Sequence, residues 1–416
     1  MSDKIKIFTI SDHPLSPSGV GTQTKYIIEG MLKTGKYEFI SFGGAIKHPS
    51  HEPQKTAEWG DDWIIWPVDG YGNADMVRAM IKQNKPDILW FMTDPRFYEW
   101  LWQIENEIRA HVPMVYYHVW DNYPYPKFNR PWYLSTDHVA CISQVTHDIV
   151  QTVAPETDSS YIPHAVDSEV FKAFDETTIA AWRQSKGLDD KFVCFWNSRN
   201  ARRKQSGTLI WWFKDFLDKV GHDKACLIMH TDVKDLNGQD LQAIVDELGL
   251  TNGEVMFSQQ KVSPQDLAGM YNMADTTICI SDAEGFGLST LESLSCETPI
   301  LVTLTGGLQD QITDGTHTFG VGIQPVSKSI IGSQQVPYIY EDRISKEDFL
   351  NGLTELYEMG REGRAQIGAL GRAWAEDRFS FDKFVQTWDD LFTQIHDEKG
   401  SWETRQGYTP YEVKVF

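Results

Sequence analysis

The chain has 416 residues, of which 41% are hydrophobic and 12% aromatic. This length favours two domains over one, and the composition excludes a disordered chain. The formal net charge of -21 reflects 59 acidic and 38 basic residues, and so acidic a surface disfavours nucleic acid and anionic membranes as partners.

The five cysteines are widely spaced and form no CxxC pair, which predicts buried reduced thiols. The start of the chain has no basic segment leading into a long apolar run, and no run approaches about 18 apolar residues. These features predict neither a secretion signal nor a transmembrane segment. A cytoplasmic location is therefore expected.

Short β-branched and aromatic runs alternate with helical patterns from the start of the chain. Seven strand candidates lie at 4–10, 37–44, 63–68, 87–92, 114–119, 138–143 and 160–166. Several are continuously apolar, which is typical of strands in a parallel sheet covered on both faces. A first Rossmann-like domain is predicted over residues 1–170.

A second series of strand candidates lies at 191–198, 225–231, 254–260, 276–281 and 298–303, with helical patterns between them. Repeated strand-helix-strand units imply right-handed crossovers and a doubly wound parallel sheet. A second Rossmann-like domain is predicted over residues 171–375, with the joint between Val166 and Lys191. The chain reads as helices from about Phe349, and residues 376–416 are predicted to cross back to the first domain.

Ligands of open parallel sheets collect at the carboxyl ends of the strands, so the cleft between the two sheets is the expected site. Gly19 and Gly21 follow the first strand and precede a helical pattern. Glycines there let the backbone approach a ligand, and the N-H groups at a helix start favour an anion. An ordinary tight turn explains these two glycines equally well.

A basic stretch follows the strand at 191–198. Arg199 and Lys204 are five residues apart and can direct a guanidinium and an ammonium at one diphosphate. A solvated basic loop is the plain alternative. Four cations lie within six residues: Arg199, Arg202, Arg203 and Lys204. In a chain with so negative a net charge, this clustering favours a functional role over a solvated loop.

His118 ends the strand candidate at 114–119, where an imidazole facing a cleft can bond a substrate hydroxyl, although a lone histidine is more often structural. An aromatic and proline-rich segment follows over 120–133. Its Trp120, Tyr123 and Trp132 can stack on a sugar face or simply pack between domains.

The stretch after the strand at 276–281 carries two carboxylates. Glu284 lies in the loop, and Glu292 falls about two turns along the following helical pattern. Carboxylates accept hydrogen bonds from paired hydroxyls, such as a ribose or sugar diol. Either glutamate alone reads as a surface residue. The helical pattern starts just after Gly285, Phe286 and Gly287. The backbone N-H groups of these residues can donate to a phosphate or sugar oxygen.

EGFGLSTLES, residues 284–293, resembles the E-x7-E segment of the retaining glycosyltransferase family 4, which has the GT-B fold. Four more stretches resemble motifs of that family in the same order: SGVGT, YIPHAVDSEVF, SRNARRK and SCETPILVTLTGGLQDQITDG. The resemblance runs from about residue 5 to residue 385. It implies two Rossmann-like domains facing across a cleft, followed by C-terminal helices.

The resemblance also implies a reaction. A sugar moves with retention from a nucleotide-diphosphate sugar, UDP- or GDP-linked, to a hydroxyl acceptor such as a saccharide or glycan. No cofactor and no catalytic metal are implied, and the chain contains no D-x-D sequence. Domain closure would exclude water from the donor.

Carried onto this chain, the resemblance gives each donor-side residue a role. Arg199 and Lys204 neutralise the leaving diphosphate, Glu284 contacts the transferred sugar, and Glu292 contacts the ribose. Glu297 departs from the family, which usually has glycine there.

On the first domain, the resemblance implies that Gly19 and Gly21 line the phosphate side and that His118 lies near the reacting sugar. His118 is followed by Val119 instead of the frequent Asp, and Asp121 comes three residues after it.

Two other readings stay open. The first is a GT-B phosphorylase or epimerase: a phosphorylase would need a phosphate site beside the sugar, and the extra cations Arg202 and Arg203 leave that open. The second is an inactive relative that only binds the sugar nucleotide. The stretch from about Gly400 matches no motif of the family.

Overall fold

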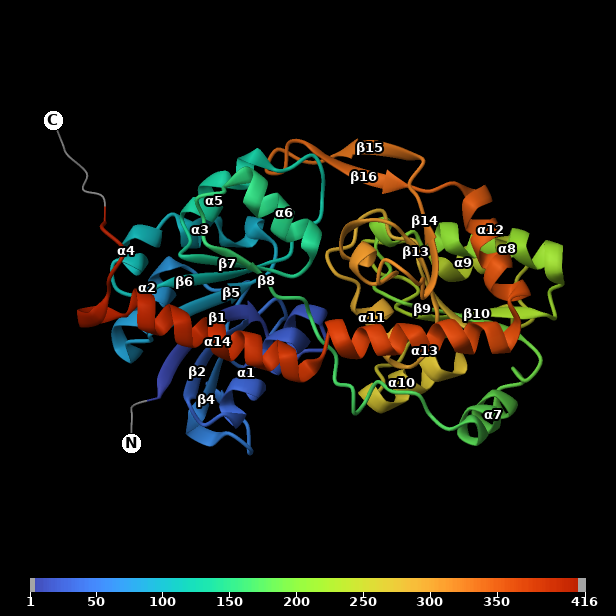
Figure 1. Ribbon diagram of the computed structural model, residues 1–416, viewed down its shortest axis with the longest axis horizontal. Helices are drawn as coiled ribbons and strands as arrows, with labels where there is room; N and C mark the ends of the chain where they lie inside the picture. Colours follow the sequence, from blue (N-terminus) through green and yellow to red (C-terminus); the bar gives the residue numbers. More distant parts are fainter. Residues whose placement is uncertain (1–3, 411–416) are drawn as a thin grey trace.

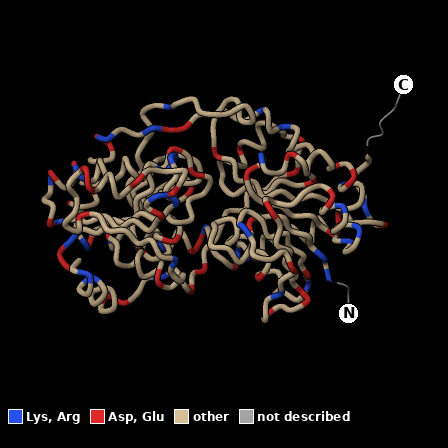
Figure 2. The backbone as a smooth tube through the Cα atoms, turned by 180° about the vertical axis from the view of Figure 1, so that it is seen from behind, with Lys and Arg blue, Asp and Glu red and all other residues tan. Residues whose placement is uncertain are grey.

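The structure is a computed structural model that describes residues 4–410. Two α/β domains lie side by side along its long axis, each built on its own sheet (Figure 1). Acidic and basic residues are dispersed over both domains (Figure 2). No helix within the described residues is long and apolar enough to cross a membrane.

The first domain contains an eight-stranded sheet in the order β3-β4-β2-β1-β5-β6-β7-β8. Every neighbouring pair is parallel except β3 with β4. The short edge strand β3 has no counterpart among the predicted strands. The bounds are β1 (Ile5–Asp12), β2 (Tyr37–Gly44), β3 (Gln54–Lys55), β4 (Trp63–Pro67), β5 (Ile88–Met92), β6 (Met114–His118), β7 (His138–Cys141) and β8 (Ser159–Tyr161).

Helices cover both faces of this sheet, which explains why its strands are continuously apolar (Figure 1). Their bounds are α1 (Gly19–Lys33), α2 (Ala74–Asn84), α3 (Glu99–Trp102), α4 (Glu105–Arg109), α5 (Arg130–Leu134) and α6 (Gln144–Val153). Helix α1 begins where the Ser18 hydroxyl accepts the N-H of Gly21 at 2.9 Å. This cap satisfies one of the unpaired donors of the first turn and fixes the entry of the helix beside the cleft.

The second domain contains a six-stranded, fully parallel sheet in the order β11-β10-β9-β12-β13-β14. The predicted doubly wound arrangement is confirmed, and β14 is a strand that the sequence did not predict. The bounds are β9 (Phe192–Asn197), β10 (Ala225–His230), β11 (Val255–Ser258), β12 (Thr276–Cys279), β13 (Ile300–Thr303) and β14 (Gly320–Ile323).

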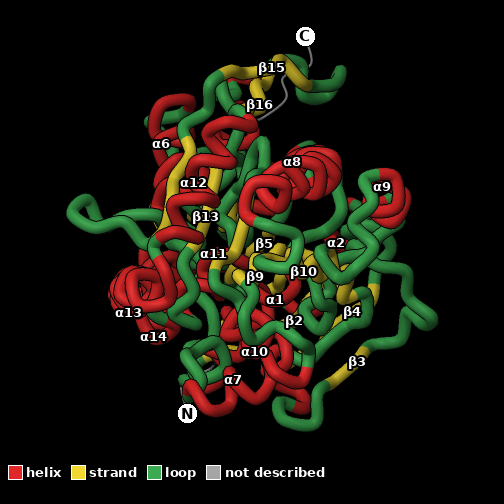
Figure 3. Tube along the Cα trace, turned by 90° about the vertical axis from the view of Figure 1, so that its right-hand side faces the viewer, coloured by secondary structure: helices red, strands yellow, loops and turns green. Residues whose placement is uncertain are grey.

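Helices also cover both faces of the second sheet (Figure 3). Their bounds are α7 (Glu176–Ser185), α8 (Ser206–Val220), α9 (Leu241–Glu247), α10 (Pro264–Met273), α11 (Leu288–Ser295), α12 (Lys346–Glu358) and α13 (Gly360–Arg378). A buried carboxylate ties two of them to the sheet. Asp275 pairs with Arg183 of α7 at 3.0 Å and with Arg364 of α13 at 2.8 Å.

Helix α14 (Phe381–Lys399) continues from α13 and lies along the first domain (Figure 1). Trp388 is fully buried there, with ring centroids 5.9 Å from Trp90 and 4.9 Å from Tyr117. The Tyr37 hydroxyl donates to Asp389 at 2.6 Å. The end of the chain therefore holds the first domain by both apolar and polar contacts.

An antiparallel hairpin, β15 (Ser327–Ile331) and β16 (Ile339–Arg343), leaves the second domain after β14. It stands apart from both main sheets at the top of the molecule in Figures 1 and 3. The sequence predicted no hairpin here.

Candidate active site

The candidate site forms where loops at the carboxyl ends of the strands of the two sheets meet. On the second domain, the loop after β9 contains a short 3-10 turn over Arg202–Lys204, and the loop after β12 carries Glu284. On the first domain, the facing segments follow β1 and β6. Each segment is a strand-to-helix connection, the place where an open parallel sheet binds ligands.

Glu284 lies beside two cations. Its carboxylate pairs with Lys204, and the Arg203 guanidinium lies 3.8 Å from the same oxygen. Both partners of the Glu284–Lys204 pair are largely buried, with side chains 13% and 12% exposed. Burial raises the pKa of Glu284, but Lys204 and Arg203 outweigh burial and leave that pKa below its ordinary value. Glu284 is therefore an anion at neutral pH.

The arginine that accompanies Lys204 differs from the one the sequence indicated. Arg199 is 64% exposed, and its guanidinium pairs with Asp235 at 2.6 Å. Arg203 instead donates to the carbonyl of Ala283, next to Glu284. The 3-10 turn explains the difference, because Arg203 and Lys204 lie on it and both reach the Glu284 loop, whereas Arg199 lies before the turn.

Glycines allow the Glu284 loop to pack closely against the segment after β13. A β-carbon on Gly306 would lie 1.9 Å from the backbone oxygen of Glu284, and the φ of Gly306 is +50°. The N-H of Gly307 donates to that same oxygen at 3.0 Å. The glycine pair therefore fixes the backbone that carries Glu284.

Gly285, Phe286 and Gly287 lead into α11. Gly287 has a φ of +92° at the helix start, which only glycine adopts easily. The Phe286 side chain is 3% exposed and packs on the rings of His164 and Phe379, with centroids 5.0 and 5.6 Å away. The Phe286 side chain therefore anchors the loop, so only the backbone of Phe286 is available to bind a ligand.

Glu292 of α11 is held by a chain of hydrogen bonds from the end of β9. The Asn197 amide donates to the Tyr271 hydroxyl at 2.8 Å, and that hydroxyl donates to Glu292 at 2.6 Å. Burial raises the pKa of Glu292 to about 7, although the bond from Tyr271 acts in the opposite direction. Tyr271 orients the carboxylate and was not among the predicted site residues.

The raised pKa of Glu292 predicts a pH-dependent stability. Because an ordinary glutamate has a pKa of about 4.3, the folded protein binds more protons than the unfolded chain between about pH 4.3 and pH 7. The contribution of Glu292 to the free energy of unfolding should therefore fall as the pH rises through this window. Asp121 and Asp282, whose pKa values burial raises to about 6, act in the same direction. The buried His118 and His164, whose pKa values burial lowers to about 3, contribute in the opposite direction.

Urea unfolding of the wild type and Glu292→Gln at pH 5 and pH 7.5 isolates this contribution. Between the two pH values the variant should lose less stability, or gain more, than the wild type, because it lacks the proton that Glu292 binds on folding. An equal change in both proteins would show that Glu292 titrates near its ordinary pKa.

The two glycines after β1 have different surroundings. A β-carbon on Gly19 would lie 3.0 Å from the side chain of Leu288, the first residue of α11. One on Gly21 would lie 2.6 Å from the carbonyl oxygen of His13 within the loop itself. Gly19 is therefore the point where the first domain approaches α11, and Gly21 is needed for the tight turn.

His118 does not occupy the position that the resemblance implied. Its side chain is fully buried, and its Nε2 is bonded to the Tyr133 hydroxyl at 2.7 Å. Burial lowers the pKa of His118 to about 3, so the ring is neutral. The expectation that His118 faces the reacting sugar is corrected accordingly, because α5 covers the end of β6 and its Tyr133 binds the ring.

Asp121, three residues after His118, lies at the meeting point of the domains. Its Oδ2 lies 4.0 Å from the position of a β-carbon on Gly285, and its own β-carbon lies 3.4 Å from that position on Gly306. Burial raises the pKa of Asp121 to about 6, while Arg203 acts to lower it. The sequence offered one signal for this residue, its place just after a strand end.

A protein-family model matches the second domain. Residues 179–369 match the family described as glycosyl transferases group 1, which is less than half of the chain. The glycosyl transferases group 1 match includes β9 to β14, the cation turn and both carboxylates, so the family match and the site geometry concern the same elements.

Curated relatives match over short segments. The D-inositol 3-phosphate glycosyltransferase of Paenarthrobacter aurescens is 37% identical over 82 residues, 20% of this chain and 19% of that protein. The protein of the same name from Corynebacterium urealyticum is 35% identical over 151 residues, 32% of this chain and 35% of that protein. The chain thus matches about a fifth to a third of the length of these relatives.

Solved structures match over nearly the whole chain. A sucrose-phosphate synthase from Thermosynechococcus elongatus has a TM-score of 0.74 at 14% identity and covers 95% of this chain and 100% of its own. The Anabaena protein HepE, in complex with UDP and glucose, has a TM-score of 0.69 at 17% identity and covers 94% and 100%. At such identities the likeness concerns the fold, and the predicted GT-B arrangement is confirmed.

Proposed function

We propose that the chain is a retaining glycosyltransferase that moves a sugar from a nucleotide-diphosphate sugar to a hydroxyl acceptor. One observation carries the proposal. Arg203 and Lys204 converge on Glu284 at the carboxyl ends of the second sheet, opposite Asp121 and Gly19 of the first domain. Two cations and a carboxylate at a domain junction suit a ligand that carries both phosphates and hydroxyls.

The two cations would act on the leaving group. As the bond between sugar and diphosphate breaks, negative charge grows on the diphosphate oxygens, and fixed positive charges in a closed site stabilise it. Lys204 now pairs with Glu284, and a bound diphosphate competes for that ammonium. Glu284 is then free to accept hydrogen bonds from the hydroxyls of the transferred sugar.

The nucleotide would lie along α11. Glu292 is held by Tyr271 two turns beyond the Glu284 loop, where a carboxylate can accept both hydroxyls of a ribose. The comparison protein HepE was solved with UDP and glucose, which supports a UDP-linked donor, and GDP is the second candidate. The charge of Arg203 and Lys204 supports transfer without a catalytic metal.

No observation favours the phosphorylase reading. It requires a cation for a phosphate beside the sugar, but both terminal guanidinium nitrogens of Arg202 donate to Glu341, at 2.9 and 2.7 Å. Arg203 is already assigned to the donor diphosphate in the proposed transfer.

Thermal unfolding against UDP, GDP, ADP, TDP and CMP, each with and without EDTA, tests the proposal. A ligand at about 100 times its Kd adds roughly 2.7 kcal/mol of stability, so one nucleotide should raise the midpoint, equally with and without EDTA. Lys204→Ala should lose most of this rise. Absence of a shift with every nucleotide would reject the proposal, and a shift that EDTA removes would reject its metal-free form.

A further inference from the structure

The β15–β16 hairpin belongs to the second domain but packs on the first. Val336, in the turn between its strands, is 4% exposed and lies in the apolar core of the first domain. The N-H of Tyr340 donates to the carbonyl of Tyr123, and the Asn122 amide donates to the carbonyl of Tyr340 at 3.0 Å. The hairpin therefore spans the junction between the domains.

The same hairpin strand also reaches the cation turn. Glu341 of β16 binds Arg202, and the N-H of Asp342 donates to the carbonyl of Asp282 at 2.9 Å. Glu341 is 6% exposed, so this contact is part of the packed structure. The hairpin thus links the donor loops to the segment that follows β6.

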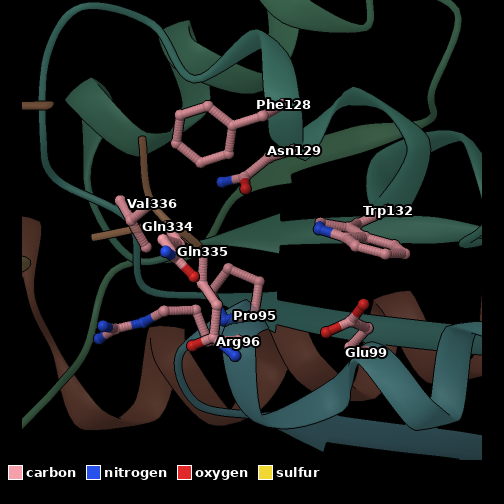
Figure 4. A pocket seen from close by; sticks show the side chains of 9 residues that line it. All are labelled: Pro95, Arg96, Glu99, Phe128, Asn129, Trp132, Gln334, Gln335 and Val336. Atoms are coloured by element: carbon pink, nitrogen blue, oxygen red, sulfur yellow. The ribbon is translucent and has the colours of Figure 1, made fainter. Parts of the chain in front are cut away.

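A cavity of about 270 Å³ lies between the turn of the hairpin and the first domain. The walls from the first domain follow β5 and β6, and Gln335 and its neighbours close the opposite side (Figure 4). Ligand pockets for drug-sized molecules span roughly 300–1,000 Å³, so this volume suits one small ring better than a nucleotide. Neither domain encloses the cavity alone.

The walls of the cavity combine aromatic rings with polar groups. Phe128 and Trp132 supply the rings, and the Trp132 indole nitrogen lies on the side of the ring that faces the cavity (Figure 4). Trp102 stacks on Trp132 at 5.2 Å and holds it in place. Asn129, which is 2% exposed, adds an amide group. Glu99 adds a carboxylate that can accept hydrogen bonds from hydroxyl groups. Apolar ring faces with a few fixed polar groups suit a sugar ring.

The charges in the cavity argue against a phosphorylated ligand. Within residues 4–410 the Glu99 carboxylate has no ion-pair partner, so its negative charge is uncompensated. Arg96 also lines the cavity, but Asp94 holds its guanidinium at 2.7 and 2.9 Å. A phosphate would meet a free carboxylate and a neutralised arginine.

We propose that this cavity binds one neutral sugar ring of a saccharide acceptor, as a subsite completed by the hairpin of the second domain. The proposal rests on the proposed glycosyl transfer and extends it to the acceptor. One segment connects the two places: the chain after β6 carries Asp121 at the domain junction and then supplies Asn129 and Trp132 to the cavity. Asn122, next to Asp121, donates to the carbonyl of Tyr340 in the hairpin that closes the cavity. A saccharide with one hydroxyl beside Asp121 is therefore proposed to extend along this segment.

The test is binding of the full-length protein to an array of neutral, phosphorylated and sulfated oligosaccharides, since dense display strengthens weak binding. The double variant Glu99→Gln/Gln335→Ala changes two exposed side chains of the cavity. Glu247→Gln/Gln265→Ala makes the same changes at exposed positions of α9 and α10 as the matched control. The nucleotide panel is measured on all three proteins to report on the donor site.

The wild type and the control should bind neutral saccharides, and the cavity variant should bind them about tenfold or more weakly with an unchanged nucleotide shift. No saccharide binding, a preference for phosphorylated saccharides, or equal binding by both variants would overturn the subsite. A nucleotide shift in any of these cases would leave the proposed function standing. Cavity-dependent saccharide binding without a nucleotide shift would support the subsite and reject the donor chemistry.

Discussion

Lys204→Ala should lower kcat by about 10²- to 10³-fold, because it removes a positive charge that acts on the leaving diphosphate in the proposed transfer. Arg203→Ala should cause a loss of the same order, since Arg203 lies 3.8 Å from Glu284 on the same turn. Arg199→Ala should cost far less, because that side chain is 64% exposed and pairs with Asp235. The kcat of donor turnover, with the sugar nucleotide chosen from the nucleotide panel, measures all three.

The three variants also decide which arginine completes the cation pair. Circular dichroism and the unfolding midpoint of each variant show whether it remains folded. A larger loss in Arg199→Ala than in Arg203→Ala would restore the assignment indicated by the family motif. Losses below about threefold in both Lys204→Ala and Arg203→Ala would remove the turn from the catalytic machinery altogether.

Asp275→Ala should destabilise the protein by about 3–5 kcal/mol, the usual cost of removing one partner from a buried ion pair. Asp275 has a side chain 8% exposed and binds Arg183 and Arg364, which are 7% and 8% exposed. Its loss leaves two buried guanidinium groups without their carboxylate. Because these arginines belong to α7 and α13, both helices should loosen from the second sheet.

Urea unfolding followed by circular dichroism measures this loss. Asp246→Ala is the matched control, because it removes an exposed aspartate of α9 and should change the stability by no more than about 0.5 kcal/mol. Similar midpoints for the two variants would mean that the backbone carbonyls that also bind Arg183 and Arg364 are sufficient partners.

The sequence by itself determined the two parallel sheets, and it placed Lys204 and Glu284 just after strands. The apolar runs of β1 and β12 are buried on both faces, and that pattern is local and readable. Because the carboxyl ends of parallel strands share one edge of a sheet, both residues were expected at the same cleft. Their ion pair was not predicted and is seen only in the structure.

The tertiary structure alone decided which neighbours of these residues share the site. A 3-10 turn directs Arg203 instead of Arg199 towards Glu284, and Tyr133 of α5 keeps His118 in the core while Asp121 reaches the junction. The cavity is lined by segments far apart in the chain, residues 95–132 and 334–336. Side-chain direction in a loop and contacts between distant segments depend on how whole elements pack, and no local pattern in the sequence encodes that packing.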